Sequence, residues 1–261
     1  MINMQSLHTD GDYLIALRMF QSRPSTDCNH SYWAVFKAAH LKLSKNKCPI
    51  CECSLNGSIS RASAHGTTTL SPTIDHYRPK DPAFYPLLKC DHENYLLMCS
   101  DCNNNYKGNK FPLHHSTPSR NTTATNTRSI TNEKPLIVNP IYDDVLNLFK
   151  LSFKQTTSGR KVLELIPLYD EVTNSYLHEK AKTTIKLFGL GKCEEDVHPN
   201  SNIHNCRINI LSMHFNKFHN FIVALKNKDL TKAYHIAKTN NLEEYGFFNF
   251  IQKKLYQDLI P

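Results

Sequence analysis

The sequence predicts an α+β fold in which a mainly helical chain encloses a small metal-bound module. Apolar residues recur at helical spacing on both sides of this module, which indicates packing helices. Two Cys-x2-Cys pairs and short apolar runs mark the module itself. A polar stretch with 12 Ser, Thr or Asn among 19 residues follows. We therefore expect a helical segment at 1–45, the module at 46–115, a linker or surface loop at 116–134 and a mainly helical region at 135–261.

The charge of the chain favours a polyanionic partner. Lys and Arg number 31 against 23 Asp and Glu, a formal net charge of +8, although a basic balance alone says nothing about fold or catalysis. The excess is concentrated at 31–47 and 207–240, which we expect to form the electrostatic footprint. No stretch approaches the roughly 20 apolar residues of a membrane helix, so no membrane partner is expected.

The cysteine content favours metal binding over disulfides. The chain has nine cysteines, an odd number, and residues 1–10 lack the basic and apolar regions of a secretory leader. We therefore expect a cytoplasmic protein whose paired cysteines bind a metal ion in a reducing compartment.

The N-terminal segment is predicted to contain a helix that packs on the core. Ser31 is a candidate N-cap, and Trp33, Phe36, His40 and Leu43 follow at helical spacing. Because His40 shares the apolar side, we expect a core or boundary histidine with satisfied hydrogen bonds there, not a metal ligand.

The region after 134 is predicted to combine two short strands with helices. The strands are expected near 148–153 and 162–166. Leu177, Ala181, Ile185 and Phe188 then recur every three or four residues before Gly189, which indicates a helix with a glycine stop. A second apolar stripe at 208–225 is typical of a core helix.

The two Cys-x2-Cys pairs predict a structural zinc site. Such a pair forms a tight knuckle that turns two thiolates toward one ion, and two knuckles complete a tetrahedral set. Because four thiolates leave no open coordination position, the zinc is expected to be structural. The expected ligands are Cys48, Cys51, Cys99 and Cys102.

Five other cysteines are expected to lie outside this set. Cys53 and Cys90 compete for the assignment, but Cys53 is two residues from Cys51 and Cys90 has no near partner in the sequence. Ordinary buried thiols are expected at the remaining three positions, Cys28, Cys193 and Cys206.

Between the knuckles, the order of elements is strand, loop, strand and helix. The first strand is expected at 73–80, the second at 93–98, and a helix opens near Asn103. Asp75-His76 lies on the first strand and Asn94 begins the second, nine residues before Asn103. This pattern resembles the HNH, or ββα-metal, endonucleases. The expected fold is therefore a mainly helical α+β protein with an embedded zinc-bound ββα-metal (HNH) module.

The resemblance implies a role for each of these residues. Asp75 and Asn103 would bind a catalytic Mg²⁺ or Mn²⁺, His76 would be the general base, and Asn94 would orient the histidine loop. The chemistry needs these residue types, since water attacks an anionic phosphodiester poorly unless a neutral imidazole takes its proton. A divalent cation on hard oxygen ligands offsets the charge that develops on the phosphate. Candidate phosphate contacts are Arg78, Lys80, Lys107 and Lys110.

A narrower resemblance concerns three sequence segments, CPIC, IDHYRPK and ENYLLMCSDCNNNYKGNKFPL. It is similar to the PtuB-type HNH proteins of Septu and retron antiphage systems, best over 48–113. This implies a PtuA-like ABC-type ATPase as partner, docked on 135–261, and in some systems a retron reverse transcriptase with its RNA/DNA hybrid. The chain departs from many relatives at Leu190-Gly191-Lys192, where they carry Leu-Asn-Arg, and this affects the expected partner surface.

Two alternatives to a DNA endonuclease stay open. A toxin-like ribonuclease would keep the same catalytic residues, because the metal contacts phosphate and the groups that read the 2′-OH lie elsewhere. A non-catalytic zinc-dependent module would use the knuckles only to present basic residues to nucleic acid. The two classes differ in whether Asp75, His76 and Asn103 are needed together.

Overall fold

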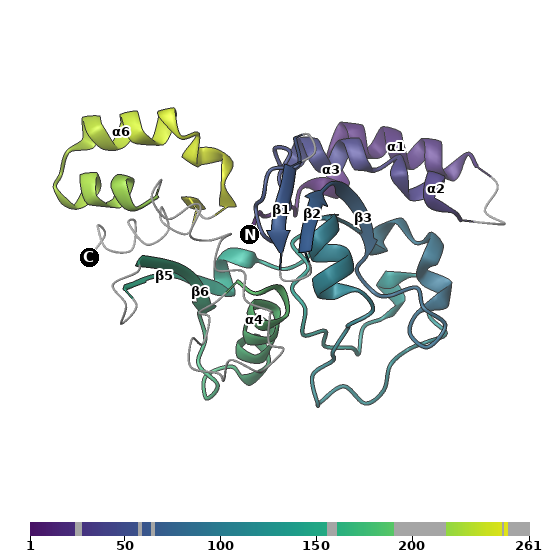
Figure 1. The fold of residues 1–261 in the computed structure, drawn as a ribbon. Helices are drawn as coiled ribbons and strands as arrows, with labels where there is room; N and C mark the ends of the chain where they lie inside the picture. Colours follow the sequence, from purple (N-terminus) through teal and green to yellow (C-terminus); the bar gives the residue numbers. More distant parts are fainter. Residues whose placement is uncertain are drawn as a thin grey trace.

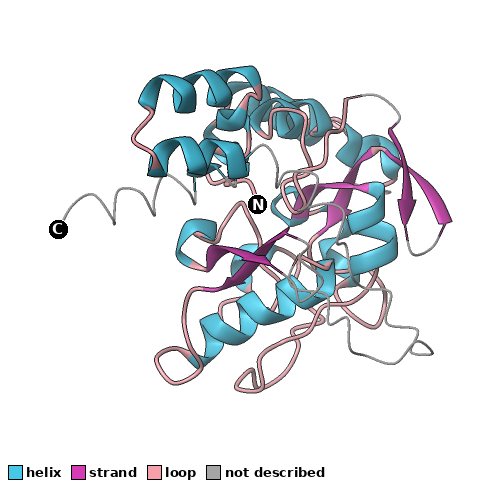
Figure 2. Cartoon of the chain, turned by 60° about the vertical axis from the view of Figure 1, so that its left-hand side comes forward, coloured by secondary structure: helices cyan, strands magenta, loops and turns pink. Residues whose placement is uncertain are grey.

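The computed structural model describes residues 1–23, 28–56, 59–63, 66–155, 161–190, 218–246 and 248–249. Its α+β character agrees with the sequence-based expectation (Figures 1 and 2). The helices with defined bounds are α1 (Gly11–Gln21), α2 (His30–Ala34), α3 (Lys37–Leu43), α4 (Ser175–Phe188) and α6 (Leu230–Thr239). The described strands pair into three antiparallel two-stranded sheets, namely β1 (Ile59–Ser63) with β2 (Gly66–Leu70), β3 (Pro72–His76) with β4 (Tyr95–Cys99), and β5 (Phe149–Gln155) with β6 (Lys161–Pro167).

The N-terminal segment forms three helices in place of the one expected. Asp10 caps α1, because its carboxylate accepts hydrogen bonds from the backbone N–H groups of residues 12 and 13. Asn29, and not Ser31, caps the next helix, since the Asn29 side chain accepts from the Ser31 N–H. The expected helix is then interrupted at Val35, between α2 and α3.

The β3–β4 hairpin and the segment after it form the centre of the predicted module. In the hairpin, Asp75 is paired with Leu96 and His76 with Tyr95. Every residue of β4 is buried, as expected for a strand covered on both sides. A π-helical segment, Asp101–Lys107, follows β4 directly and ends at Gly108. The expected order of strand, loop, strand and helix is therefore observed.

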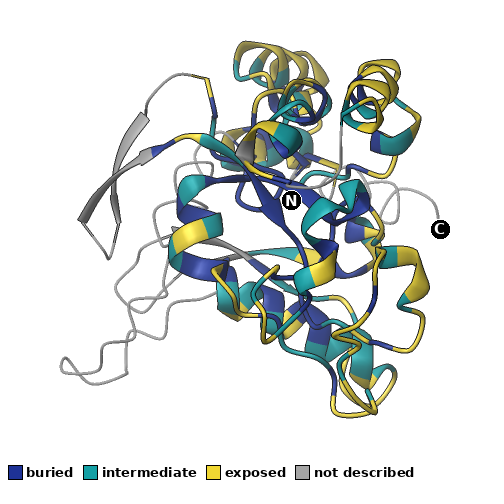
Figure 3. Cartoon of the chain, turned by 90° about the vertical axis from the view of Figure 1, so that its right-hand side faces the viewer, coloured by how far each residue is buried: buried dark blue, intermediate teal, exposed yellow. Residues whose placement is uncertain are grey.

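The core lies where the N-terminal helices meet this hairpin (dark blue in Figure 3). Phe36 and Tyr95 are in ring contact with a centroid separation of 5.6 Å. His40 is fully buried, as expected, but neither ring nitrogen has a hydrogen-bond partner among the described residues, so the expectation of a satisfied histidine is wrong. Tyr13 of α1 lies against both Phe36 and His40. The first three helices thus cover one side of the hairpin that carries Asp75 and His76.

The polar stretch 116–134 is a surface loop anchored to the module. Its only regular element in the structure is a short 3-10 turn at Thr127–Ser129. Glu133 forms a buried ion pair with Arg78 and accepts a hydrogen bond of 2.6 Å from the Asn121 N–H. The boundary expected at 135 falls inside a packed unit, because the Tyr77 hydroxyl donates to the Ile137 carbonyl and Ile137 is fully buried.

The region after 140 contains the two expected strands, β5 and β6, followed by α4. Gly189 ends α4 in the left-handed conformation at φ +61°, which confirms the glycine stop. Of the predicted stripe 208–225, only 218–225 lies within the described residues, and these are helical, with Phe218 fully buried. Within the described part of the chain, no helix has the length and apolar character needed to cross a bilayer.

Two of the cysteines form a disulfide that the sequence analysis did not anticipate. Cys28 is joined to Cys90, 62 residues away, with a Cα–Cα distance of 5.6 Å. The expectation that Cys28 is a free thiol is therefore wrong, and Cys90 no longer competes as a zinc ligand. The pairing escapes sequence analysis because it depends on how α2 packs beside the loop before β4. Cys193 and Cys206 lie outside the described residues.

Candidate functional site

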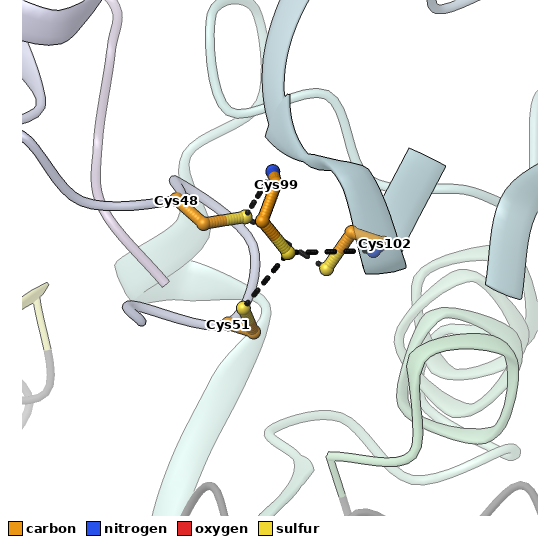
Figure 4. A group of neighbouring side chains, drawn as sticks. All are labelled: Cys48, Cys51, Cys99 and Cys102. Atoms are coloured by element: carbon orange, nitrogen blue, oxygen red, sulfur yellow. Dashed lines mark hydrogen bonds between the residues drawn. The ribbon is translucent and has the colours of Figure 1, made fainter. Parts of the chain in front are cut away.

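Four cysteines from two distant segments form one compact, fully buried cluster. Figure 4 shows the side chains converging from the turn after Lys47 and from the end of β4. Their Sγ atoms all lie within 4.8 Å of one another, and each cysteine is 0 % exposed. Sγ–Sγ distances of 3.7 Å join Cys48 to Cys102 and Cys51 to Cys99. The cluster can hold a metal ion, which confirms the grouping of the two Cys-x2-Cys pairs.

Backbone geometry explains why the sulfurs converge. In the first turn, the Glu52 N–H donates to the Cys48 carbonyl at 2.8 Å, and Glu52 adopts a left-handed φ of +58°. Backbone N–H groups also point at sulfur, with the Cys99 N–H 3.3 Å from Cys48 Sγ and the Cys102 N–H 3.3 Å from Cys99 Sγ. Such donors stabilise thiolates, the form that binds metal.

The thiols of the cluster are coupled to one another. Hydrogen bonds from Cys102 and Cys48 hold the pKa of Cys51 well below its ordinary value. Cys53 is buried beside the cluster and its side chain is hydrogen-bonded to Cys51, but its sulfur is not one of the four that gather. The structure thus favours the assignment made from spacing over one that includes Cys53.

Three of the four predicted catalytic residues line a cleft of about 360 Å³, and Asn94 does not. It lies at the end of β3, beside the π-helical segment, and has both polar and apolar walls. The cleft brings together Asp75, His76 and Asn103, as the resemblance implied. Its lining consists of Trp33, Ile74, Asp75, His76, Pro79, Lys80, Asn103, Asn104, Lys107, Gly108 and Asn109.

His76 is held in one orientation and one tautomer. Its Nε2 lies 2.9 Å from the Lys89 carbonyl oxygen, which can only accept, so Nε2 carries the proton. The lone pair of the neutral ring is therefore on Nδ1. The rings of Trp33 and Tyr95 meet the imidazole edge-on at 5.0 and 5.2 Å. Burial among these groups lowers the pKa of His76 to about 4, so the ring is neutral at pH 7.

Asp75 is buried and paired with a lysine. Lys107 Nζ lies 2.8 Å from Asp75 Oδ2 and donates to the His76 carbonyl at 2.9 Å. Burial raises the pKa of Asp75, and the charge of Lys107 opposes that rise. Lys107 is only 1 % exposed. The expectation that it contacts phosphate is therefore corrected, because its ammonium is enclosed by acceptors of the protein itself.

Asn94 fastens the chain after β3. Its side-chain oxygen accepts from the Arg78 N–H at 2.7 Å, and its amide group donates to the Arg78 carbonyl at 2.9 Å. The Asn94 carbonyl also accepts from the Tyr77 N–H at 2.7 Å. The two ends of the loop between β3 and β4 are thus joined next to His76.

Arg78 does not face solvent. The residue is 4 % exposed, its guanidinium is ion-paired with Glu133, and it donates to the Tyr85 hydroxyl at 3.1 Å. The expectation of a phosphate contact at Arg78 is corrected on this ground, because a paired and buried guanidinium cannot reach a nucleic acid backbone.

The remaining predicted residues lie at or near the cleft. Asn103 donates from Nδ2 to Thr73 Oγ1 at 3.1 Å, which leaves its amide oxygen as an acceptor. Lys80 is exposed and lines the cleft, with Nζ 4.4 Å from the centre of the Trp33 ring. Lys110 is exposed, donates to a backbone carbonyl in the preceding turn and does not line the cleft.

Most lysines of the basic region 31–47, which we expected to attract a polyanion, make contacts within the protein. Lys42 pairs with Asp12 at 2.6 Å, Lys47 pairs with Glu244 at 2.7 Å, and Lys45 donates to a backbone carbonyl. Lys42 joins α3 to α1, whereas Lys45 and Lys47 contact Glu243 and Glu244 near the other end of the chain. In the other basic region, part of 207–240 lies outside the described residues, while Lys226, Lys228 and Lys232 are exposed.

Sequence reasoning missed several groups that shape this site. Trp33 was expected only as a core residue, yet it lines the cleft and contacts His76. The Lys89 carbonyl and the Thr73 hydroxyl position His76 and Asn103. A backbone carbonyl carries no signal in the sequence, because every residue has one.

No protein-family model, curated protein or solved structure matches this chain. Any functional inference therefore depends on the residue types and geometry of the cluster and the cleft.

Proposed function

We propose that the protein is a metal-dependent endonuclease of the HNH type that hydrolyses phosphodiester bonds, with DNA the favoured substrate. One observation carries the proposal. Asp75 and His76 end β3, Asn103 lies in the π-helical segment after β4, and all three line the same cleft. The Lys89 carbonyl fixes the lone pair of His76 on Nδ1. A neutral, oriented imidazole beside oxygen ligands is the arrangement that phosphodiester hydrolysis requires.

The donor set of the cleft fits a hard divalent cation. Asp75 supplies a carboxylate and Asn103 an amide oxygen, the ligand types that Mg²⁺ and Mn²⁺ prefer. The charge of Lys107, 2.8 Å from Asp75, favours the ionised form of Asp75, which is the form that binds a cation. When bound, the cation would neutralise charge on the phosphate and the leaving oxygen. We assign Asp75 and Asn103 as the residues that would hold it.

His76 acts as the general base in this proposal. Its Nδ1 takes a proton from water as the water oxygen bonds to phosphorus and the bond to the 3′ oxygen breaks. The low pKa of His76 keeps the ring neutral at pH 7, and the nearby phosphate charge would strengthen it as a base by stabilising the imidazolium that forms. Lys80, exposed at the rim of the cleft, contacts the phosphate.

The four-cysteine cluster binds a structural zinc ion in this proposal. Four buried thiolates form a closed tetrahedral set, so the ion has no position for substrate. Cys99 ends β4, and Cys102 lies within the π-helical segment that carries Asn103 and Lys107. The zinc ion therefore fixes this segment against the first knuckle and keeps Asn103 facing the cleft.

A partner would restrain the activity, as the antiphage resemblance implies. The region after 134 offers α6, whose outer side carries Leu230 and Tyr234, 70 % and 66 % exposed, next to the exposed Lys232. We propose that a PtuA-like ABC-type ATPase docks here, in some systems together with a reverse transcriptase and its RNA/DNA hybrid. Replacing Leu230 and Tyr234 with Ala should abolish co-purification with the ATPase.

The docking test has a matched control on α1. Ile15 and Met19 are apolar residues of α1 with similar exposure, 56 % and 51 %, and α1 lies at the upper right of Figure 1, whereas α6 lies at the upper left. Replacing these two with Ala should leave the complex intact. Equal loss of the ATPase from both double variants would argue against docking on α6.

The nuclease proposal is tested by incubating purified protein with plasmid DNA and with total RNA. The protein is used alone and with its genomic neighbours, in Mg²⁺, in Mn²⁺ and in EDTA. We expect plasmid cleavage with either metal, none in EDTA and none with His76→Ala. Cleavage of RNA alone would identify the ribonuclease alternative. Binding without cleavage under every condition would support the non-catalytic alternative and overturn the proposal.

A further inference from the structure

A third group of metal-binding residue types lies away from both sites. His114 and His115 follow Leu113, which forms an isolated β-bridge with Pro135, and Glu179 lies on α4. Glu179 Oε2 is 3.4 Å from His114 Nε2 and 4.0 Å from His115 Nδ1. One ligand atom from each residue lies within 4.8 Å of the other two. Neither the cleft nor the four-cysteine cluster includes any of the three residues.

His114 is the residue that points to a ligand. It is 6 % exposed, and its Nε2 has no hydrogen-bond partner among the described residues although it faces Glu179. Its other ring nitrogen, Nδ1, accepts from the Ser116 N–H at 3.3 Å and lies 2.8 Å from the Ser116 hydroxyl, so Nε2 carries the proton in the neutral ring. Nε2 therefore directs a buried N–H that makes no hydrogen bond toward the Glu179 carboxylate, and a metal ion would take the place of this proton.

We propose that His114 Nε2, His115 Nδ1 and Glu179 Oε2 bind a divalent transition-metal ion of the Zn²⁺ class. Two imidazole nitrogens and one carboxylate oxygen suit Zn²⁺, Co²⁺ and Ni²⁺ better than Mg²⁺ or Ca²⁺, which prefer oxygen ligands alone. In the metal-bound ring Nδ1 would carry the proton and donate to the Ser116 hydroxyl, in the way that outer hydrogen bonds orient metal-bound histidines. This site does not depend on the proposed nuclease activity.

The surroundings allow an ion to enter and to stay hydrated on one side. The His115 and Glu179 side chains are 77 % and 41 % exposed, so water can complete the coordination shell. The nearby positive charge of Lys134 disfavours a cation, but its ammonium is directed over the Tyr176 ring at 5.8 Å. The next lysine along α4, Lys180, is neutralised by Asp143 at 2.6 Å.

Binding would connect two parts of the chain that are distant in sequence. The two histidines close the module, and Glu179 belongs to the helix after the β5–β6 hairpin. An ion that binds only the folded arrangement stabilises it by mass action. The site therefore acts as a metal-dependent cross-link between the module and α4, in addition to the zinc cluster inside the module.

The test uses the full chain after dialysis against a weak chelator that leaves the thiolate-bound metal in place. Zn²⁺ is titrated by calorimetry, and Co²⁺ is followed by absorption, because cobalt bound to nitrogen and oxygen lacks the strong thiolate charge-transfer bands. We expect about one further ion per chain and a higher melting temperature with added Zn²⁺. Glu179→Gln and His115→Ala should each weaken this binding by at least about ten-fold, the loss that even an outer-shell substitution can cause.

Two matched variants complete the experiment. Glu171→Gln and His235→Ala remove an exposed carboxylate and an exposed imidazole elsewhere on the surface, and both should bind the further ion like the wild type. The proposal is overturned if the wild-type chain takes up no further ion, or if Glu179→Gln and His115→Ala bind it as tightly as the controls. Thiolate bands in the added Co²⁺ spectrum would also contradict it, since they would place the ion on cysteines.

Discussion

The ammonium of Lys107 lies 2.8 Å from Oδ2 of Asp75, and both residues are buried beneath the cleft. Removing one partner of such a pair leaves an uncompensated buried charge. We expect Lys107→Met to destabilise the protein by about 3–5 kcal/mol, the usual cost of breaking a buried ion pair. It should also raise the pKa of Asp75 further, since Lys107 is the main charge that opposes the effect of burial. Urea unfolding at pH 7 measures the loss of stability.

A double variant separates the ion pair from simple loss of packing. Asp75→Asn with Lys107→Met removes both charges, so it should be more stable than Lys107→Met alone. Lys110→Met, an exposed lysine three residues away, should change stability by less than about 0.5 kcal/mol. If the stability lost by the double variant equals the sum of the losses in Asp75→Asn and Lys107→Met, the two charges are not coupled.

His76→Ala tests the general base. We expect cleavage to fall by about 10²–10⁴-fold, the usual contribution of a positioned proton acceptor. The zinc content should not change, because the four clustered cysteines are untouched. The stability should fall, because the variant loses a buried ring that contacts Trp33 and Tyr95, so the cleavage rate is compared at a temperature where both proteins are folded. His235→Ala, which removes an exposed histidine, should cut at the wild-type rate. Near-normal cleavage by His76→Ala would contradict the assignment of His76 as the general base.

The pH profile offers a second test of the same residue. Burial lowers the pKa of His76 from 6.5 to about 4, so the free enzyme carries a neutral ring down to that pH. Because kcat/KM reports the ionisation of the free enzyme, its acidic limb should appear near pH 4. A limb near pH 6.5 would show that the ring is solvated in the free enzyme.

Local patterns predicted the elements that carry the site, because their signals lie within a few residues of one another. The cysteine spacing identified the four-sulfur cluster, and the apolar period before Gly189 identified α4. The alternation of elements between the knuckles likewise predicted β3, β4 and the segment with Asn103. Each of these features is set mainly by local backbone geometry.

The remainder depends on contacts between residues far apart in sequence. Arg78 and Lys107 are of the residue types that contact phosphate. Only the fold shows that Glu133 pairs with Arg78 and that Asp75 pairs with Lys107. The β1–β2 hairpin has a weak apolar pattern and was not expected. The group formed by His114 and Glu179 requires knowledge of where α4 packs, which no local pattern gives.

The cysteine cluster makes a prediction about metal content. Cys48→Ser or Cys102→Ser should abolish zinc binding and destabilise the module, because metal-binding free energy is part of its folding free energy. Atomic absorption on the wild type, after a weak chelator has removed loosely held ions, should find about one zinc per chain.

Cys53→Ser is the matched control for these variants. Cys53 lies two residues after Cys51 and is buried, but it is not one of the four clustered cysteines. Its replacement should leave the zinc content unchanged. Loss of zinc from Cys53→Ser together with retention in Cys48→Ser would reverse the assignment of the ligands.

His40 predicts a loss of stability in acid. The side chain is fully buried, neither ring nitrogen has a partner in the described part of the chain, and burial lowers its pKa to about 3. The unfolded chain, with a pKa near 6.5, therefore binds more protons than the folded chain between these values. The contribution of neutral His40 to the free energy of unfolding is therefore complete above pH 6.5 and is lost as the pH falls toward 3. The free energy of unfolding should fall by up to about 1.4 kcal/mol per pH unit in this range.

A leucine substitution checks this interpretation. His40→Leu removes the titrating ring and two buried polar atoms, so it should flatten the stability curve between pH 6 and 4 without loss of stability at pH 7. Some slope should remain, because burial also lowers the pKa of His76, His8 and His92. His235→Leu, at an exposed position, should keep the full wild-type slope. An unchanged slope in His40→Leu would show that other groups dominate acid unfolding.

The Cys28–Cys90 disulfide predicts that stability and catalysis depend on redox state. The bond spans 62 residues, and constraining a loop of that length in the unfolded chain stabilises the fold by about 4 kcal/mol. Cys90 also follows Lys89, whose carbonyl accepts hydrogen bonds from His76 and from the Tyr95 hydroxyl. Loosening this segment should disturb the orientation of the general base.

The double variant Cys28→Ser/Cys90→Ser tests both effects without leaving an unpaired thiol. We expect a lower urea midpoint and slower cleavage than in the oxidised wild type, with the same zinc content, because the four clustered cysteines are untouched. Reductant should shift the wild type toward the variant and leave the variant unchanged, whereas Cys53→Ser should respond like the wild type. If reductant alters neither the midpoint nor the cleavage rate of the wild type, the bond contributes nothing to the fold or to the position of His76. A fall in stability at a constant cleavage rate would instead show that the Lys89 carbonyl holds His76 without help from the disulfide.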